Sequence, residues 1–342
     1  NIGLFSLISQ SFISIVSYKI YNKKNLWIFY GKEQEYNRFL KELNCHSNPP
    51  EIYFISASEP LKINKSKNLK GIIVNENDLI KLDNLENLDK LYNIKLSGIE
   101  VINLIDWFDR EYHRIPTDFI ESNYQLIKKL KSIEDNYHNR IKRLGDIFVS
   151  LIIILITLPV IFLVSCLIYL EDKGPIFYTQ KRSGLNGKII KIIKFRSMHL
   201  NAEIDGIQWS KNNDKRITSI GRIIRALRID ELPQLFCVLF GSMSLIGPRP
   251  ERPEIEKKLF KNVPYYKSRY ILKPGISGWA QVNYHYGASV ADTKQKLSYD
   301  IYYISNFSFF LDLLIFFKTI KLVLNAKGYK PKKIIDNNPN TN

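Results

Sequence analysis

The sequence predicts an α/β protein with two domains and a membrane helix between them. The chain has 342 residues, and a domain usually holds about 100–200 residues, so two domains are expected. Residues 19–125 alternate between strand and helix patterns, which is typical of a parallel α/β sheet. The apolar run Ile147–Leu170 carries no charge and is long enough to cross a membrane, because roughly 20 apolar residues span the hydrocarbon core.

Composition restricts the class of protein and of partner. Hydrophobic residues make up 45% of the chain, which is enough for a packed core and excludes wholesale disorder. Cys45, Cys166 and Cys237 share no CxxC spacing, which excludes a disulfide framework and a zinc ribbon. The 5 histidines are scattered, so a histidine-rich metal site is not expected. The net charge of +17 requires nucleic acid, anionic lipid or a phosphorylated small molecule as partner.

The first element, residues 1–18, is expected to be the end of a truncated membrane helix. Residues 2–18 are apolar and uncharged, although Ser and Gln interrupt them. An amphipathic helix is the alternative. The sequence begins with Asn1 and not with Met, so we expect that an upstream segment is missing.

Residues 19–125 are expected to form an α/β domain. In the segment Lys32–Leu43 the apolar residues fall at helical spacing. A dinucleotide site would need a GxGxxG turn after the first strand, but only Gly31 is present, so no cofactor site of that kind is expected. The domain is therefore interpreted as structural or regulatory. The predicted strands are Leu26–Tyr30, Ile52–Ile55, Gly71–Val74 and Ile99–Leu104, and the predicted helices are Lys32–Leu43 and Leu79–Leu91.

A polar connecting helix, residues 126–145, leads into a membrane helix at residues 146–171. Pro159 lies at the centre of the apolar run, where it removes a helix hydrogen bond and should kink the helix. Basic residues flank both ends, among them Lys142 and Arg143 before the run and Lys173 after it. Positive residues stay on the cytoplasmic side, so the segment could enter and leave by the same face. A kinked spanning helix is the alternative.

The second domain is expected at residues 172–329. It opens with a β-hairpin, because Asn186-Gly187 separates the strand-like runs Phe177–Gln180 and Lys188–Phe195. Further on, Ile301–Leu324 mixes aromatic residues with lysines, which suits a membrane interface. A core helix is the alternative. The tail, residues 330–342, has few apolar residues and is expected to be disordered.

The adjacent acids Asp230 and Glu231 are the candidate catalytic residues. Pro233 follows them at the start of a predicted helix that runs toward Leu239 and ends at Gly241. Such a position favours ionised carboxylates and also attracts phosphate. One acid could then act as nucleophile or base and the other could hold Mg²⁺. A plain helix cap is the common alternative.

Basic residues surround this acid pair in the sequence. Proline precedes and follows Arg249, and so fixes the backbone around one guanidinium. Acids among so much positive charge suggest a site for a polyanion bridged by a metal, although a basic face on anionic lipid is the alternative. The basic residues are Lys194, Arg196, Arg222, Arg225, Arg228 and Arg249.

The glycine-containing segment Gly275–Gln281 is expected to be a tight loop that lets its backbone approach a ligand. Gln281 could hydrogen-bond a base or a sugar there. A plain turn with Trp279 buried is the alternative.

Taken together, these segments resemble the bacterial sugar transferase family, the monotopic polyprenyl-phosphate phosphoglycosyl transferases. Each motif is weak alone, but their combination and order over about residues 142–328 are specific. The motifs are Lys142-Arg143 with Asp146, Gly174-Pro175-Ile176-Phe177, Gln180 with Arg182 and Gly184, Lys194-Phe195-Arg196-Ser197-Met198, Asp230-Glu231-Leu232-Pro233-Gln234-Leu235, GSMSLIGPRP at 241–250, Lys273-Pro274-Gly275 and Gln281-Val282-Asn283.

The resemblance implies transfer of a sugar 1-phosphate from a UDP-sugar to undecaprenyl phosphate, with release of UMP. This is the first membrane step of exopolysaccharide, capsule or O-antigen biosynthesis. In the family the aspartate of the Asp-Glu pair forms a covalent phospho-sugar intermediate, a role that falls on Asp230, while Glu231 would hold Mg²⁺. The residues that would bind substrate are Lys194, Arg196, Arg225, Arg249, Pro250 and Gln281.

The same resemblance implies an architecture and a location. Residues 19–125 look like the Rossmann-like domain of the longer members, and residues 172–329 like their α+β transferase domain with interfacial helices. Pro159 matches the helix-breaking proline of a re-entrant helix, which favours re-entry over spanning. The protein is then expected in the bacterial inner (cytoplasmic) membrane with its catalytic domain on the cytoplasmic face. Its partners would be a UDP-sugar, undecaprenyl phosphate and membrane lipid, and a homodimer is expected because such assemblies are common.

The sequence departs from the family pattern at two places. Ala226-Leu227 and Phe236-Cys237 replace residues that the family often carries as more polar ones, which weakens inference about the sugar but not about the reaction.

Two other functions are the alternatives to this interpretation. One is a membrane-anchored, sugar-nucleotide-binding regulatory protein without turnover. The other is a nucleic-acid-binding protein, which we do not expect, because no recognition motif of that type is present.

Overall fold

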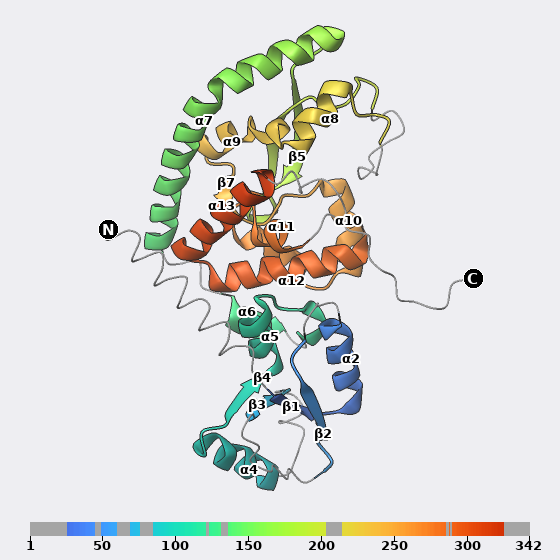
Figure 1. Cartoon of the computed structure of the whole chain (residues 1–342), viewed down its shortest axis with the longest axis vertical. Coiled ribbons are helices and arrows are strands. Elements are labelled where there is room, and N and C mark those ends of the chain that lie inside the picture. The colour runs from blue at the N-terminus through green and yellow to red at the C-terminus, as the bar shows by residue number, and fades with distance from the viewer. Residues whose placement is uncertain are drawn as a thin grey trace, which may run out of the picture. The chain divides into compact units, whose positions relative to one another are not determined.

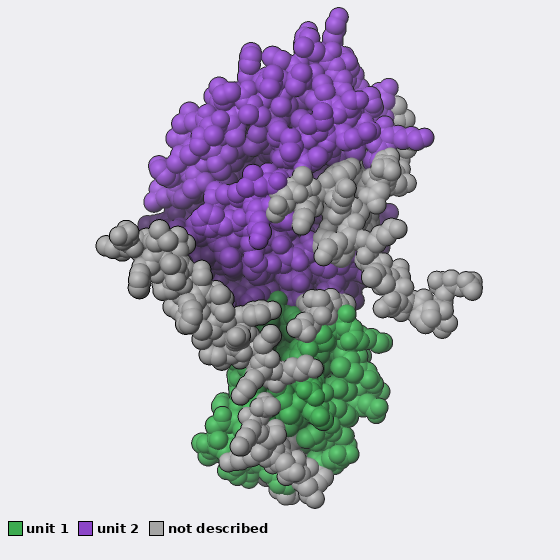
Figure 2. Space-filling model, in the orientation of Figure 1, with its two compact units in different colours: residues 1–112 green, residues 113–342 purple. Residues whose placement is uncertain are grey.

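The computed structural model describes residues 26–44, 49–59, 69–75, 85–120, 123–130, 136–202, 214–284, 287 and 289–324. The chain divides into two compact units, residues 1–112 and residues 113–342, which Figure 2 colours separately. This division falls before the predicted domain boundary at residue 125. The predictions for residues 1–18 and for the tail at 330–342 lie outside the described residues.

Unit 1 is built on a parallel sheet of strand order β2-β1-β3-β4. All four predicted strands are confirmed. Of the predicted helix Leu79–Leu91, the described part is helical and continues to Leu96, and a further helix, α5, follows β4 directly. The elements are β1 (Leu26–Gly31), α2 (Glu33–Leu43), β2 (Ile52–Ser56), β3 (Leu69–Val74), α4 (Leu85–Leu96), β4 (Glu100–Asn103) and α5 (Leu104–Tyr112).

The sheet buries side chains on both of its faces. Phe29 of β1 packs against Phe39 of α2, which in turn contacts Trp107 and Phe108 of α5. Alternate residues of the same strands, together with Leu91 of α4, form a second cluster. Because successive residues of a strand point to opposite faces, helices on both faces explain why these strands are apolar throughout.

Unit 2 begins with residues that pack on its own helices. The backbone N–H of Ile115 donates to the carbonyl of Ser298 in α12 (2.9 Å), and the short helix η1 (Thr117–Phe119) is buried in part. These contacts explain why residues 113–120 belong to the second unit and not to the first. The polar segment that follows contains α6 (Asn123–Lys129).

The rest of unit 2 combines a two-stranded antiparallel hairpin, a short parallel strand pair and helices (Figure 1). The predicted hairpin is confirmed, and both residues of its Asn-Gly turn have positive φ, at 54° and 74°. The elements are α7 (Asn136–Asp172), β5 (Phe177–Ser183), η2 (Leu185–Gly187), β6 (Ile189–Phe195), α8 (Ser219–Ala226), η3 (Ile229–Glu231), α9 (Gln234–Leu239), β7 (Ser244–Ile246), α10 (Pro253–Asn262), η4 (Tyr266–Ile271), β8 (Gly275–Ser277), α11 (Trp279–Asn283), α12 (Val290–Asn306) and α13 (Phe309–Leu324).

The segment expected to be a tight loop, Gly275–Gln281, is a strand followed by a helix. Strand β8 pairs in parallel with β7, and α11 begins at Trp279. Glycine permits this pairing, because a Cβ on Gly275 would lie 2.1 Å from the backbone nitrogen of Gly247. Trp279 is buried, as the alternative interpretation of this segment expected.

Helix α7 continues through Pro159 without a break, and its axis curves along its length (Figure 1). Within the described residues, Asn139–Asp172 is the one helix long and apolar enough to cross a membrane, and only 17% of its most apolar window is buried. Large apolar side chains such as Phe148, Ile156 and Phe162 face outward. The predicted membrane helix is therefore present as a helix with an exposed apolar surface.

The start of α7 is fastened to the rest of unit 2 by three polar side chains. Lys142 Nζ lies 2.6 Å from Asp312 Oδ2 of α13. Arg143 donates to the last carbonyls of α9, including that of Leu239 (2.7 Å). Asp146 accepts from the backbone N–H of Leu245 in β7 (3.0 Å). The basic residues read from the sequence as a membrane flank thus have partners within the protein.

The segment Ile301–Leu324 falls in two helices, and the core-helix alternative is confirmed for the first of them. Helix α12 is a core helix, since Leu297, Ile301 and Tyr303 are buried. Helix α13 instead exposes apolar side chains, among them Phe310 and Phe317. Its composition suits a membrane interface.

Replacing Lys142 by Met is expected to lower the free energy of unfolding by roughly 3 kcal/mol or more, because it leaves the Asp312 carboxylate largely buried without its cation. The double variant Lys142→Met/Asp312→Leu should recover most of this loss. Thermal unfolding in detergent measures both. The control is Lys128→Met, at an exposed lysine of α6. Equal losses in the single and the double variant would contradict the ion-pair explanation.

Candidate active site

The acid pair lies in a buried turn and not on the helix that follows it. Asp230 and Glu231 belong to the 3-10 turn η3, and both are buried. Arg228 enters this turn with a left-handed backbone (φ 56°). The N-cap residue of α9 is Pro233 and makes no side-chain cap, so neither acid caps α9. The helix-cap interpretation therefore fails.

Glu231 binds three cations that come from different elements. Its carboxylate lies 3.2 Å from Lys194 Nζ on β6 and 2.5 Å from Arg249 Nη2 in the loop after β7. Arg228, at the entry of η3, approaches it to 3.4 Å. The structure thus brings Lys194 and Arg249 to the acid pair, as the sequence predicted. Arg249 itself is 39% exposed, so its guanidinium is also open to a phosphate from solvent.

The two acids have opposite pKa shifts. Burial alone would raise the pKa of Glu231, but the charges of Arg249, Lys194 and Arg228 outweigh it and hold that pKa well below its usual range. Burial, together with the charge of Glu231, raises the pKa of Asp230 from 3.8 to about 6. Charges on Lys194, Arg225 and Arg249 oppose this rise. At neutral pH both acids are ionised, with Glu231 strongly paired and Asp230 less so.

A carboxylate that is ionised at neutral pH but has a raised pKa is a better nucleophile than an ordinary aspartate, because its anion is less stabilised. Asp230 therefore has the properties needed to attack an electrophilic centre. The surrounding cations could offset the negative charge of a phosphorylated substrate.

The remaining predicted binding residues lie in different surroundings. Arg225, on α8, acts on Asp230 through its charge. The carbonyl of Pro250 accepts from Arg182 (3.2 Å). Gln281 donates from Nε2 to the carbonyl of Ile276 (3.1 Å), and no contact in the described part of the chain joins it to the acid pair.

The structure gives Arg196 a role that the sequence did not suggest. Its guanidinium is buried and pairs with Asp172 at the end of α7. Because β6 alternates, Lys194 and Arg196 would share one face of a regular strand, but the strand ends at Phe195. Arg196 is therefore placed against α7 and not beside Glu231.

Sequence reasoning missed a polar layer behind Arg249. Arg269 of η4 donates to the backbone carbonyl of Arg249 (2.6 Å) and pairs with Asp300 of α12 (2.8 Å). Glu256 of α10 accepts from the hydroxyl of Ser183. These residues belong to no motif and lie far apart in the sequence, so nothing in the sequence pattern groups them.

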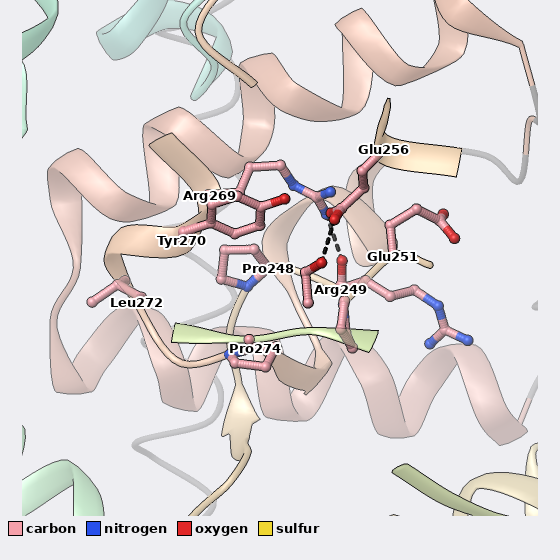
Figure 3. A pocket seen from close by; sticks show the side chains of 11 residues that line it. Pro248, Arg249, Glu251, Glu256, Arg269, Tyr270, Leu272 and Pro274 are labelled. Atoms are coloured by element: carbon pink, nitrogen blue, oxygen red, sulfur yellow. Dashed lines mark hydrogen bonds between the residues drawn. The ribbon is translucent and has the colours of Figure 1, made fainter. Parts of the chain in front are cut away.

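This layer lines a small cavity, shown in Figure 3. Its volume of about 10 Å³ is close to the room that one water molecule needs. It is far smaller than the several hundred Å³ of a typical ligand pocket, on the order of 300–1,000 Å³. The cavity is therefore too small for a sugar nucleotide, and the contact that holds the Arg249 loop from this side is the hydrogen bond from Arg269.

The protein side chains of the site could supply only some of the ligands that a Mg²⁺ ion needs. Among the described residues no three His, Cys, Asp or Glu side chains form a metal-binding group. Mg²⁺, however, is usually bound by one or two carboxylates together with waters and substrate phosphates. The ionised carboxylate of Glu231, next to that of Asp230, meets this requirement.

Comparison with known proteins gives a family and a set of relatives. The model of the family described as bacterial sugar transferase matches residues 137–326. A UDP-N-acetylgalactosamine-undecaprenyl-phosphate N-acetylgalactosaminephosphotransferase from Aeromonas hydrophila is 47% identical over 188 residues, which are 55% of this chain and 44% of that protein. A UDP-glucose:undecaprenyl-phosphate glucose-1-phosphate transferase from Klebsiella pneumoniae is 38% identical over 191 residues, or 55% of this chain and 41% of the relative.

The match thus spans less than half of the length of these two relatives. A shorter relative, the exopolysaccharide production protein PSS of Rhizobium leguminosarum bv. phaseoli, is 39% identical over 196 residues, which are 55% of this chain and 98% of that protein. The family model covers more than half of the chain and includes the whole acid-pair cluster. The chain belongs to the bacterial sugar transferase family.

Proposed function

We propose that the protein transfers a sugar 1-phosphate from a UDP-sugar to undecaprenyl phosphate and releases UMP. The observation that carries this proposal is the buried Asp230 beside a Glu231 that three cations hold ionised. The names of the relatives, which are undecaprenyl-phosphate sugar phosphotransferases, support the same reaction class. The reaction would be the first membrane step of exopolysaccharide, capsule or O-antigen biosynthesis.

In the first step a carboxylate oxygen of Asp230 attacks the phosphorus that carries the sugar. A bond forms between that oxygen and the phosphorus, the bond from the phosphorus to the bridging pyrophosphate oxygen breaks, and UMP leaves with the electron pair. In the second step a phosphate oxygen of undecaprenyl phosphate attacks the same phosphorus and releases Asp230. A covalent intermediate lets a water-soluble donor and a lipid acceptor use one site in turn.

The cations around Glu231 make the first step feasible. A carboxylate anion approaches a pyrophosphate only when nearby positive charge offsets the repulsion. Arg249 and Lys194 supply fixed charge, and the partial exposure of Arg249 leaves it open to the donor. Mg²⁺, held by Glu231, would neutralise further charge on the pyrophosphate.

We infer that α7 enters and leaves the membrane by the same face. Its start is fastened to β7, α9 and α13 through Asp146, Arg143 and Lys142. Its end packs on the same unit, where Ile168 contacts the cluster around Phe195 and Asp172 pairs with Arg196. A spanning helix would place its ends on opposite sides of the hydrocarbon core of the bilayer, which is about 30 Å thick. Both ends of α7 instead contact the same compact unit. This supports re-entry. The basic residues Lys142, Arg143 and Lys173 at the two ends of the apolar segment favour the cytoplasmic face of the inner membrane for this unit.

Asp230→Asn is expected to lower UMP release by at least about three orders of magnitude, because the amide is a poor nucleophile. The assay uses detergent-solubilised protein with Mg²⁺, with and without undecaprenyl phosphate. UDP-N-acetylgalactosamine and UDP-glucose start the donor panel, since relatives are named for these sugars. The control is Asp118→Asn, at a half-exposed aspartate of η1. Wild-type rates in Asp230→Asn would refute the mechanism, and donor binding without any turnover would favour a binding protein.

The raised pKa of Asp230 predicts a pH-dependent stability in metal-free buffer. Folded Asp230 keeps its proton up to about pH 6, whereas the unfolded residue loses it near 3.8. Between these values the folded state binds more protons, so the free energy of unfolding falls as the pH rises. Asp230→Asn does not titrate, and its stability relative to wild type should increase by on the order of 2–3 kcal/mol from pH 4 to pH 7. Thermal unfolding with EDTA measures this, and a constant difference would contradict the shift.

Re-entry predicts that the first domain and the catalytic domain lie on the same side of the membrane. Single cysteines would replace Glu33 of α2 and Lys257 of α10, both exposed, in a variant without native cysteines. A membrane-impermeant maleimide applied to intact cells should label neither position, and lysis should make both reactive. Labelling of only one position in intact cells would show that α7 spans the membrane.

A further inference from the structure

All three guanidinium nitrogens of Arg269 donate hydrogen bonds to protein groups behind the acid pair. Nε pairs with Asp300 Oδ2 (2.8 Å), Nη1 donates to the hydroxyl of Tyr266 (2.5 Å), and Nη2 donates to the backbone carbonyl of Arg249 (2.6 Å). The guanidinium also lies over the Tyr266 ring, 5.0 Å from its centroid. With every nitrogen occupied in this way, Arg269 is not placed to bind a substrate.

The bond to Arg249 lies between two carbonyls that other groups hold: that of Pro248 accepts from the backbone N–H of Gly275 (3.0 Å), and that of Pro250 accepts from Arg182 (3.2 Å). Pro248 and Pro250 fix their own φ angles but offer no N–H groups. The carbonyl of Arg249 accepts from Arg269, and this bond orients the peptide between the two prolines. In Figure 3 the Arg249 side chain points away from Arg269, while the dashed line from Arg269 reaches its backbone.

The backbone and the side chain of Arg249 thus make different contacts. Its carbonyl is held from behind, and its side chain reaches forward to Glu231 (2.5 Å). Asp300 makes this arrangement possible, because it is almost fully buried and balances the charge of Arg269. Tyr266, which also contacts Glu256 (3.4 Å), fixes the guanidinium from another direction.

We propose that Arg269, paired with Asp300, is a positioning residue that orients the Arg249 peptide so that the Arg249 guanidinium reaches Glu231. It acts only through Arg249 and touches no reacting atom. The kinetic part of this inference rests on the proposed function, since it assumes that Arg249 serves the transfer reaction.

A double-mutant cycle with Arg249 tests the proposal. Arg269→Lys keeps a positive charge beside Asp300, but one ammonium group cannot reproduce the three-way contact. We expect it to lower kcat roughly tenfold or more, since small displacements of catalytic groups are costly. In an Arg249→Ala background the same change should cost less than about twofold. Equal losses in both backgrounds would overturn the proposal, because independent effects add.

A matched control separates this effect from general damage. Arg216 pairs with Asp214 (2.6 Å) in the same unit, and Arg216→Lys should leave kcat within about twofold of wild type, as expected for a site away from special features. If Arg269→Lys does not fold, Arg269→Gln/Asp300→Asn replaces it in the cycle, because it removes both buried charges together.

Hydrogen exchange gives a readout that needs no turnover. The backbone amides of Gly275 and Ser183 donate to the loop carbonyls of Pro248 and Glu251 (3.0 Å each). They should exchange faster in Arg269→Lys than in wild type, and Arg216→Lys should not change them. If wild-type protein turns over no donor, the proposed function fails, and exchange alone then decides whether Arg269 orders the loop. Unchanged exchange at these amides would overturn the proposal.

Discussion

The catalytic unit depends on the pairing of one buried carboxylate, that of Glu231. A buried charge without partners costs several kcal/mol, so its cations must be held in place together with it. Here these cations are Lys194 of β6, Arg228 at the entry to η3 and Arg249 after β7. The need to balance the charge of Glu231 therefore holds three separate segments of the chain next to one another. In the same turn, burial and the charge of Glu231 raise the pKa of Asp230, while Lys194 and Arg249 oppose this rise.

The long apolar helix α7 meets a similar requirement at both of its ends. The Lys142–Asp312 pair fastens its start, and the Arg196–Asp172 pair fastens its end. Each pair is formed between α7 and a different part of unit 2, so the helix cannot move as an independent anchor. The acid pair is consequently held at a fixed position relative to α7.

Local patterns predicted the elements well, and motifs predicted part of the site. The strands of unit 1 are apolar and bounded by turns, so their positions followed from the sequence, as did the hairpin at Asn186-Gly187. Lys194 and Arg249 were found because they lie in motifs with the acid pair. Arg196 could not be placed, because the end of β6 and the contact with Asp172 are tertiary features. Arg269 and Asp300 were missed for the same reason, since only the folded chain brings η4 and α12 together behind Arg249.

The close approach of glycine backbones near this loop limits how the active site can evolve. A Cβ on Gly247 would lie 2.4 Å from the carbonyl oxygen of Lys273, and one on Gly278 would lie 2.3 Å from that of Gly247. Even the smallest side chain at these positions would push the Arg249 loop away from β8. Variation near Arg249 is therefore confined to side chains around the loop, because the path of its backbone leaves no room for a side chain at these two glycines.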